Sequence, residues 1–393
     1  MKAITFLLAA SLSLCACGGG GGGGTSPPTS PPVSPPPPPP AAVLSGQFKD
    51  ANTAGLSYST ASQSGVTDNS GRISYRSGET VQFTVGGIVI GETGGAPVVT
   101  PVDLVPDGSS DSPQVSNIVR FLMMLDQNAD PADGIFISQA VREMAVNWSQ
   151  VDFSSADHGN ELVTIVSDVA SVDQRTPVLP DAAAAQAHLE GTFRCIASGL
   201  FVGNFAGDRS STIFLLVYPS TGRVKASYLF DLGLQFNGVE PVSVDQQRTF
   251  LSEIPDVEGS RLEGRFDSFD EISGSWTAGS QSGTFSASRA LPDATARYRL
   301  TGEWFYDVVK PTLDGVEVFN IDSSGNLVGV GYSVESDNRY PNSGMLTGQD
   351  IVINWDVGAV SQGTLDANLS VSGTGANSAG ASRPWFAQGC RLN

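Results

Sequence analysis

The C-terminal half of the chain alternates short apolar strands with glycine- and serine-rich turns. The segments 214–231 (FLLVYPSTGRVKASYLFD) and 316–334 (VEVFNIDSSGNLVGVGYSV) share one order of strand, Ser/Thr-Gly turn and strand. A second pair of segments, 259–288 and 342–370, also matches. Each half would be a meander of about a hundred residues, which buries little by itself. Residues 191–393 are therefore expected to form an antiparallel β-barrel or sandwich built from two repeats that close together.

Two tryptophans occupy matching positions in the second pair of segments. Trp276 corresponds to Trp355, and Gly264 corresponds to Gly348. Matching core positions explain the tryptophans best, although both side chains would also suit the wall of a ligand cavity. Chance similarity between Gly/Ser-rich hairpins is the alternative to a true repeat.

The segment 43–105 also has the pattern of short strands. Turns built from Asp68-Asn69-Ser70-Gly71 and from residues 76–79 separate them, and Val81, Phe83 and Val85 alternate with polar residues. These features predict a small β-sandwich-like module. The whole fold is thus expected to be mostly β, with a helical insert.

The insert is residues 106–190, where the apolar period changes to that of helices. Ser112 followed by Pro113 is a typical helix start, and an i, i+3, i+4 apolar stripe follows it. Helices are expected from Pro113, from Ser138, over 160–172 and over 181–187.

Between the first two helices, "DQNADPADGI" (126–135) is a candidate ion-binding loop. Asp126, Asn128 and Asp130 are spaced like the first three ligands of a calcium loop, and Asp133 would add a later one. The pattern departs from an EF-hand because Pro131 stands where glycine is needed. A helix–helix turn made of Asp, Asn, Pro and Gly is the simpler interpretation.

The first seventeen residues have the pattern of a cleaved bacterial signal. A positive start precedes residues 3–14, an apolar core whose helix of about 18 Å is too short to span a bilayer. The stretch Leu14-Cys15-Ala16-Cys17 resembles the lipobox of bacterial lipoprotein precursors. That resemblance implies cleavage after Ala16 and acylation of Cys17, which would make the lipid bilayer a partner. An ordinary secretory signal with two incidental cysteines is the alternative.

Residues 18–42 form an expected tether. Seven glycines are followed by a proline-rich run, which would be stiff and extended. Gly18 is not the aspartate that retains enteric lipoproteins at the inner membrane, so the resemblance implies the outer membrane as the location. The face on which the protein is displayed stays open.

The first strand-rich module resembles one found in uncharacterised proteobacterial surface lipoproteins and adhesin-like proteins. This resemblance implies a location more than an activity. The residues that carry it are Thr67-Asp68, Gly71, Tyr75, Gly78, Phe83, Gly86-Gly87 and the run Thr100-Pro101-Val102-Asp103-Leu104.

Two cysteines remain once Cys17 is acylated. Cys195 stands at the entrance of the C-terminal β-domain and Cys390 close to its last residues. An exported protein meets an oxidising compartment, so a Cys195–Cys390 bond that joins first strand to last is expected. Two independent buried thiols are the alternative.

Composition limits the function. The formal charge of −19 disfavours nucleic acid as a partner. The two histidines, His158 and His188, are too few for an ordinary zinc site, and no catalytic motif is present, so no catalytic residue is assigned. An envelope lipoprotein that binds an unknown ligand, adheres or has a structural role is expected. The alternative is a carboxylate-dependent hydrolase of glycans.

Overall fold

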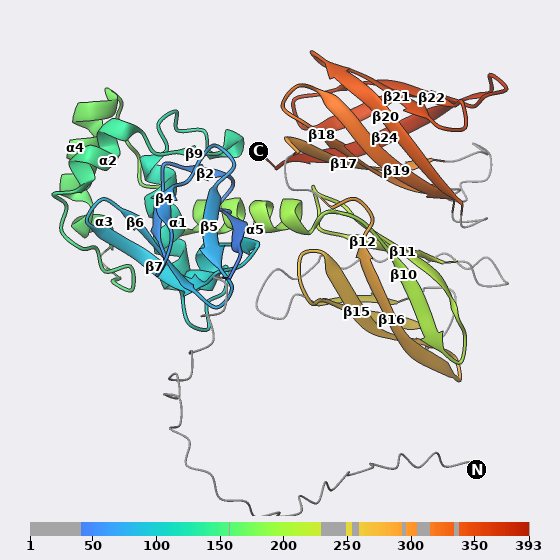
Figure 1. Cartoon of the computed structure of the whole chain (residues 1–393), viewed down its shortest axis with the longest axis horizontal. Helices are drawn as coiled ribbons and strands as arrows, with labels where there is room; N and C mark the ends of the chain where they lie inside the picture. The colour runs from blue at the N-terminus through green and yellow to red at the C-terminus, as the bar shows by residue number, and fades with distance from the viewer. Residues whose placement is uncertain are drawn as a thin grey trace, which may run out of the picture. The chain divides into compact units, whose positions relative to one another are not determined.

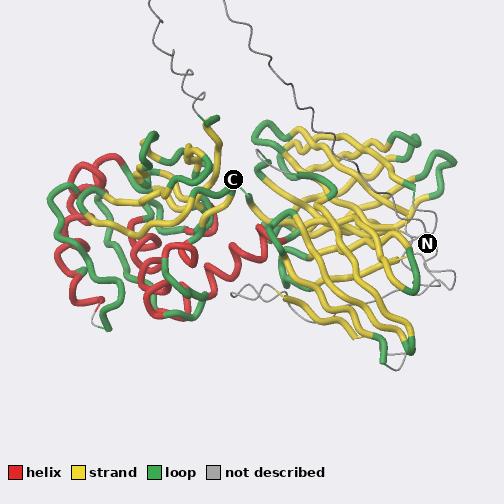
Figure 2. The backbone as a smooth tube through the Cα atoms, turned by 60° about the horizontal axis from the view of Figure 1, so that its bottom comes forward, coloured by secondary structure: helices red, strands yellow, loops and turns green. Residues whose placement is uncertain are grey.

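The structure is a computed structural model that describes residues 41–156, 158–228, 249–253, 259–292, 296–304, 315–333 and 338–392. The expected signal, Cys17 and almost all of the expected tether lie outside the described residues. Figure 2 shows helices in the part that precedes the C-terminal strands, and sheet thereafter. The expected fold class, mostly β with a helical insert, is confirmed.

The N-terminal strands form small sheets. One sheet has the order β5-β1-β8 and a second has the order β4-β3-β6-β7, while β2 pairs with β9. In β6 the predicted alternation holds, because Val81, Phe83 and Val85 are fully buried. The strands are β1 (Val43–Phe48), β2 (Thr53–Ala54), β3 (Ser57–Ser59), β4 (Ser64–Val66), β5 (Arg72–Arg76), β6 (Thr80–Val85), β7 (Ile88–Gly94), β8 (Val98–Val99) and β9 (Ile135–Phe136).

The helices begin where their caps predict. Ser112 and Pro113 start α1, the Ser138 hydroxyl accepts a hydrogen bond from Val141 N at the start of α2, and the Asp181 carboxylate accepts one from Ala184 N at the start of α5. The helices are η1 (Pro101–Leu104), α1 (Pro113–Leu125), η2 (Pro131–Asp133), α2 (Gln139–Ala145), α3 (His158–Glu161), α4 (Val163–Asp173) and α5 (Ala182–Ala197).

Helix α5 is longer than expected. It continues past Ala187 because Ala185, Leu189 and Phe193 form a stripe that packs on α1. Cys195 therefore lies in the last turn of a helix and not in a strand.

The strand-rich segment 43–105 and the helical segment 106–190 share one hydrophobic core. Phe48 and Phe83 from the strands pack in the same cluster as Ile118, Phe121 and Leu122 from α1. Neither segment buries these side chains by itself, so the two fold as parts of one core.

The C-terminal residues form two β units (Figure 1). The first is a seven-stranded sheet of order β12-β11-β10-β16-β15-β14-β13, and the second is a closed barrel of eight antiparallel strands, β17 to β24. The sheet consists of β10 (Gly199–Gly207), β11 (Ser211–Val217), β12 (Val224–Tyr228), β13 (Thr249–Glu253), β14 (Arg261–Phe266), β15 (Glu271–Ala278) and β16 (Gln281–Arg289). The barrel consists of β17 (Tyr298–Trp304), β18 (Gly315–Ile321), β19 (Asn326–Ser333), β20 (Arg339–Thr347), β21 (Asp350–Trp355), β22 (Val360–Leu365), β23 (Ser370–Ala376) and β24 (Ser382–Arg391).

The two halves do not close together as the sequence suggested. The second half closes on itself through the pairing of β17 with β24, because eight strands already enclose an interior that side chains can fill. Each unit has its own core, and their outer faces meet where Leu200 and Phe214 pack with Val316 and Val330.

Only one of the two sequence matches falls on equivalent strands. Segments 214–231 and 316–334 contain the turns β11–β12 and β18–β19, which come second and third in each unit. Segment 259–288 forms β14–β16, and β16 pairs with β10, the first strand of its unit. Segment 342–370 covers β20–β22, and β23 and β24 still follow before β24 pairs with β17 and closes the barrel. The second match reflects hairpin composition and not position.

Candidate functional site

The interior of the barrel is filled at one end. Side chains at the beginnings of β17, β19 and β21 and at the ends of β18, β20 and β22 close this end with apolar groups. They are Tyr298, Ile321, Leu327, Leu346, Ile351 and Leu365. No ligand can enter among side chains packed in this way.

The opposite end of the barrel holds a cavity of about 320 Å³. Its walls contain three of the five tryptophans of the chain, together with one tyrosine, two serines and one acid. These side chains are Trp304, Tyr340, Trp355, Trp385, Ser361, Ser378 and Glu317. A cavity of this size lies at the small end of the range for ligand sites.

Glycines on three neighbouring strands make room for the large side chains. A Cβ at Gly315 would lie 1.8 Å from the Trp304 ring, and one at Gly331 would lie 2.8 Å from both Trp304 and Trp355. A Cβ at Gly302 would lie 2.5 Å from Glu317 Oε1. The aromatic wall and the acid therefore require glycine at these inward positions.

The aromatic rings form a continuous wall. The ring of Trp304 lies 5.6 Å from that of Trp355 at an angle of 72°, and 6.4 Å from that of Tyr340. Phe319 bridges Trp355 and Trp385, with centroid distances of 6.2 and 6.0 Å. These edge-to-face contacts hold the rings in fixed orientations.

Glu317 is the unusual group in this cavity. Its side chain is fully buried; Oε1 accepts a hydrogen bond from Trp385 Nε1, and no described residue hydrogen-bonds Oε2. Burial raises the pKa of this carboxyl to about 8; the Trp385 hydrogen bond opposes the shift, and the nearby charge of Glu303 adds to it. An unsatisfied buried carboxyl oxygen is costly, so it marks a place where a partner belongs.

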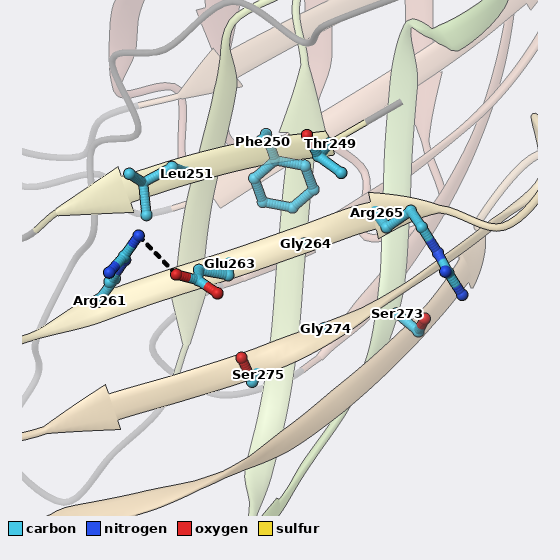
Figure 3. A pocket seen from close by; sticks show the side chains of 10 residues that line it. All are labelled: Thr249, Phe250, Leu251, Arg261, Glu263, Gly264, Arg265, Ser273, Gly274 and Ser275. Atoms are coloured by element: carbon cyan, nitrogen blue, oxygen red, sulfur yellow. Dashed lines mark ion pairs between the residues drawn. The ribbon is translucent and has the colours of Figure 1, made fainter. Parts of the chain in front are cut away.

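A second, larger hollow of about 670 Å³ lies over β13, β14 and β15 (Figure 3). Arg261 and Glu263, both on β14, form an ion pair at 2.6 Å, and Arg265 pairs with Asp267 at 2.6 Å. These charges are exposed and already paired, and no described residue that lines the hollow has a buried side-chain oxygen or nitrogen without a hydrogen-bond partner. The barrel cavity is the stronger candidate.

The two matched tryptophans have different roles. Trp276 is buried in the core of the seven-stranded sheet, where its Nε1 donates to Ala206 O at 3.2 Å. Trp355 packs against the barrel core and also lines the cavity, with its Nε1 donating to Ser361 Oγ at 3.1 Å. Both tryptophans thus pack against a core, and Trp355 also serves as a cavity wall.

The sequence patterns did not predict Glu317 as a site residue, although its position in the strand is unusual. It stands between Val316 and Val318 in a strand with apolar residues on both faces, where a charged residue is out of place. Recognising this requires knowing that the outer face of β18 is also covered, and that depends on the neighbouring sheet.

The predicted calcium loop has the geometry of a turn. Asp126 is fully buried, and its two oxygens accept hydrogen bonds from Asp130 N at 2.8 Å and Phe136 N at 2.9 Å. Asn128 Nδ2 donates to both oxygens of Asp133 at 3.1 Å. Among the described residues, no group of three or more His, Cys, Asp or Glu side chains is arranged to hold a metal ion. Calcium binding stays a prediction.

The predicted disulfide is present. Cys195 and Cys390 are bonded, with their Cα atoms 5.6 Å apart. The bond joins the end of α5 to β24 and does not join first strand to last. Two buried arginines support the same joint, because Arg289 donates to Ile196 O at 2.9 Å and Arg299 to Ser198 O at 2.8 Å.

In the described part of the chain, no helix combines the length and the apolar character needed to cross a membrane.

Comparisons with known proteins leave the family open. No family model matches the chain, and no curated protein matches it. Among solved structures, the chain overlaps with isotype 1 transferrin-binding protein B from serogroup B Neisseria meningitidis, at 10% identity and a TM-score of 0.18. The overlap covers 49% of this chain and 43% of that protein.

A second solved structure is that of a protein of unknown function from the DUF3598 family of Nostoc punctiforme. It matches at 9% identity and a TM-score of 0.14, over 51% of this chain and 98% of that one. Scores this low do not establish a common fold.

Proposed function

We propose that this protein is a lipid-anchored lipoprotein of the outer membrane whose C-terminal barrel binds a small ligand. One observation carries the binding role: the fully buried carboxyl of Glu317 leaves Oε2 without a described hydrogen-bond partner inside an aromatic cavity. A buried acid without a partner destabilises the fold, so a ligand that satisfies it accounts for the site.

The sequence before the folded part supports the lipid anchor. Leu14-Cys15-Ala16-Cys17 provides the lipobox, and the glycines and prolines after Cys17 provide a tether. Acyl chains on Cys17 would bury many methylene groups, which suffices for stable attachment to a bilayer. The ligand cavity would then face the periplasm or the medium at the end of a long, partly stiff linker.

The cavity does not favour a glycan hydrolase. Hydrolysis of a glycosidic bond needs two carboxyl groups, about 5–10 Å apart. Among the described residues that line the cavity, Glu317 is the one acid. The geometry therefore supports binding over hydrolysis.

The binding role can be tested by filling the cavity. A Cβ at Gly375 would meet only Ser361 Oγ, at 3.2 Å, so Gly375→Leu should place its side chain in the cavity. Thr374→Leu is the matched control, because Thr374 is exposed on the opposite face of the same strand. Tryptophan fluorescence of the purified protein should respond to small amines, sugars or aromatic acids in wild type and in Thr374→Leu, and not in Gly375→Leu. No response to any compound, or a response that survives Gly375→Leu, would refute the cavity as a binding site.

A further inference from the structure

We infer that the ligand of this cavity is an organic ammonium ion, held between the carboxylate of Glu317 and the indole rings of Trp304 and Trp355. This inference rests on the proposed ligand-binding function and specifies its chemistry. It follows from three observations: the unpartnered carboxyl oxygen of the buried Glu317, the aromatic walls around it and the charged side chains nearby.

The buried group calls for a positive partner. Glu317 Oε1 accepts a hydrogen bond from Trp385 Nε1, and Oε2 has no described partner. A carboxylate inside a protein is stabilised best by an opposite charge that also donates a hydrogen bond or lies in close contact. A small cation in the cavity would supply that charge.

The walls suit a cation as well. Trp304, Trp355 and Tyr340 surround the space beside Glu317, and tryptophan is the aromatic residue with the strongest attraction for a cation over its ring. An alkylated ammonium ion gains both from this attraction and from burial of its alkyl groups. A metal ion would gain little here, because hard cations prefer a full set of oxygen ligands and the described lining offers few.

The charged side chains described near Glu317 do not provide the positive partner that its carboxylate needs. Glu303 lies on the outer face of β17, where its carboxylate pairs with Lys225 Nζ at 2.5 Å, and it adds a negative field. Arg383 lines the cavity, and its Nη1 donates to Ser382 O at 2.9 Å. The other ionisable side chain among the described lining residues is Tyr340.

Binding is then coupled to loss of a proton. Burial keeps Glu317 protonated at neutral pH in the free protein, since its pKa is about 8. Entry of a cation favours the carboxylate, so the proton leaves Glu317 for the solvent and the ammonium takes its place as the partner. Affinity should rise about tenfold between pH 6 and 7, and should level off above pH 8.

The experiment is isothermal titration calorimetry on the purified protein. The probes are choline and tetramethylammonium, with 3,3-dimethyl-1-butanol as the uncharged analogue of choline. Wild type should bind the cations at least about tenfold more tightly than the neutral analogue at pH 8.5. At pH 7, titrations in buffers of different ionisation enthalpy should show release of close to one proton per cation bound.

Two variants separate the causes. Glu317→Gln keeps an oxygen that can accept from Trp385 Nε1 and removes the charge, so it should bind the cations no better than the neutral analogue and release no proton. Glu271→Gln removes one exposed negative charge elsewhere and should behave like wild type.

The outcomes distinguish this inference from the proposed function. If the neutral analogue binds as tightly as choline and Glu317→Gln leaves both unchanged, the cavity binds an uncharged ligand; the proposed function then stands and the inference fails. If none of the three probes binds, the inference fails, and the fluorescence comparison of wild type with Gly375→Leu decides the proposed function. If binding of a probe persists in Gly375→Leu, both fail.

Discussion

The ammonium group of Lys49 donates a hydrogen bond to the carbonyl oxygen of Leu392 at 2.6 Å, across 343 positions of sequence. Lys49 is 6% exposed and follows β1, whereas Leu392 follows β24. The same region contains the Cys195–Cys390 bond, and Leu392 packs with both cysteines. The first and last described strands are thus fastened at one place.

Replacing Lys49 should loosen this junction. Lys49→Met keeps the apolar stem and removes the donor to Leu392 O, so it should lower the free energy of unfolding by about 1–3 kcal/mol. Denaturant titration measures the change, and Lys49→Arg, which retains donors, should lose less. Equal stability of Lys49→Met and wild type would show that the contact contributes nothing.

The buried acid should make stability depend on pH. The pKa of Glu317 is raised from 4.5 to about 8, so the folded state keeps a proton that the unfolded state releases in this range. Relative to Glu317→Gln, wild type should therefore lose about 1.4 kcal/mol of stability per pH unit between these values, and nothing below pH 4.5. Denaturant titrations of both proteins from pH 4 to 9 measure the difference. A constant difference over that range would mean that Glu317 does not titrate as inferred.

The His188–Asp50 pair should also make the protein less stable as the pH rises, but from a higher starting pH. His188 Nε2 on α5 lies 3.2 Å from Asp50 Oδ1, and Asp50 is fully buried. Burial by itself lowers the pKa of His188, but attraction to the Asp50 carboxylate outweighs it and raises the pKa above 6.5. The stabilisation is therefore complete below about pH 6.5 and is lost as the pH rises through the higher pKa of the folded state.

Chemical denaturation of a His188 variant tests this sign. His188→Gln should destabilise the protein more at pH 6 than at pH 9. A larger loss at pH 9 would mean that the neutral imidazole, and not the ion pair, is the stabilising form.

The turn at Asp126 predicts a stability loss that calcium does not affect. Asp126→Ala leaves the N–H group of Phe136 without its acceptor, while Asp130 N keeps its hydrogen bond to Asn128 Oδ1, so the loss should be about 1–3 kcal/mol. The melting temperature should fall by the same amount with added calcium and with a chelator. A melting temperature that falls on chelation in wild type, and not in a variant lacking Asp126 and Asp130, would instead establish the calcium site.

The lipobox predicts that membrane attachment depends on Cys17 and not on Cys15. Cys17→Ser should move the protein from the membrane fraction to the soluble fraction, whereas Cys15→Ser should leave it anchored. Labelled palmitate should enter wild type and Cys15→Ser only. Equal incorporation into Cys17→Ser would overturn the anchor.

The features that the sequence predicted are those set by local chemistry. Helix starts at Ser112, Ser138 and Asp181 depend on a cap and its next few residues, and each is confirmed. The cysteine pair followed from the small number of thiols and the expected compartment, and the bond is present. Alternation predicted the buried residues of β6 for the same reason, since neighbouring positions decide it.

The features that were missed depend on distant contacts. Helix α5 extends to Ala197 because it packs on α1; Ala185, Leu189 and Phe193 have the spacing of a helical face, but only the position of α1 shows that this face is buried. Closure of the barrel is decided by the pairing of β17 with β24, far apart in sequence. The cavity needs Gly302, Gly315 and Gly331 to meet Trp304 and Glu317, a combination that appears only after the strands are in register.

The disulfide also orders events during synthesis of the chain. Cys195 and Cys390 are 195 positions apart, and every strand from β10 to β23 lies between them. Since ribosomes build a chain from its N-terminus, the thiol of Cys195 must wait until both β units have been made and β24 has reached α5. A chain whose synthesis stops before Cys390 keeps a free thiol at Cys195, which can form a disulfide with another molecule. The bond can therefore form only in molecules that contain both β units, whereas a disulfide within one unit could also form in a truncated chain.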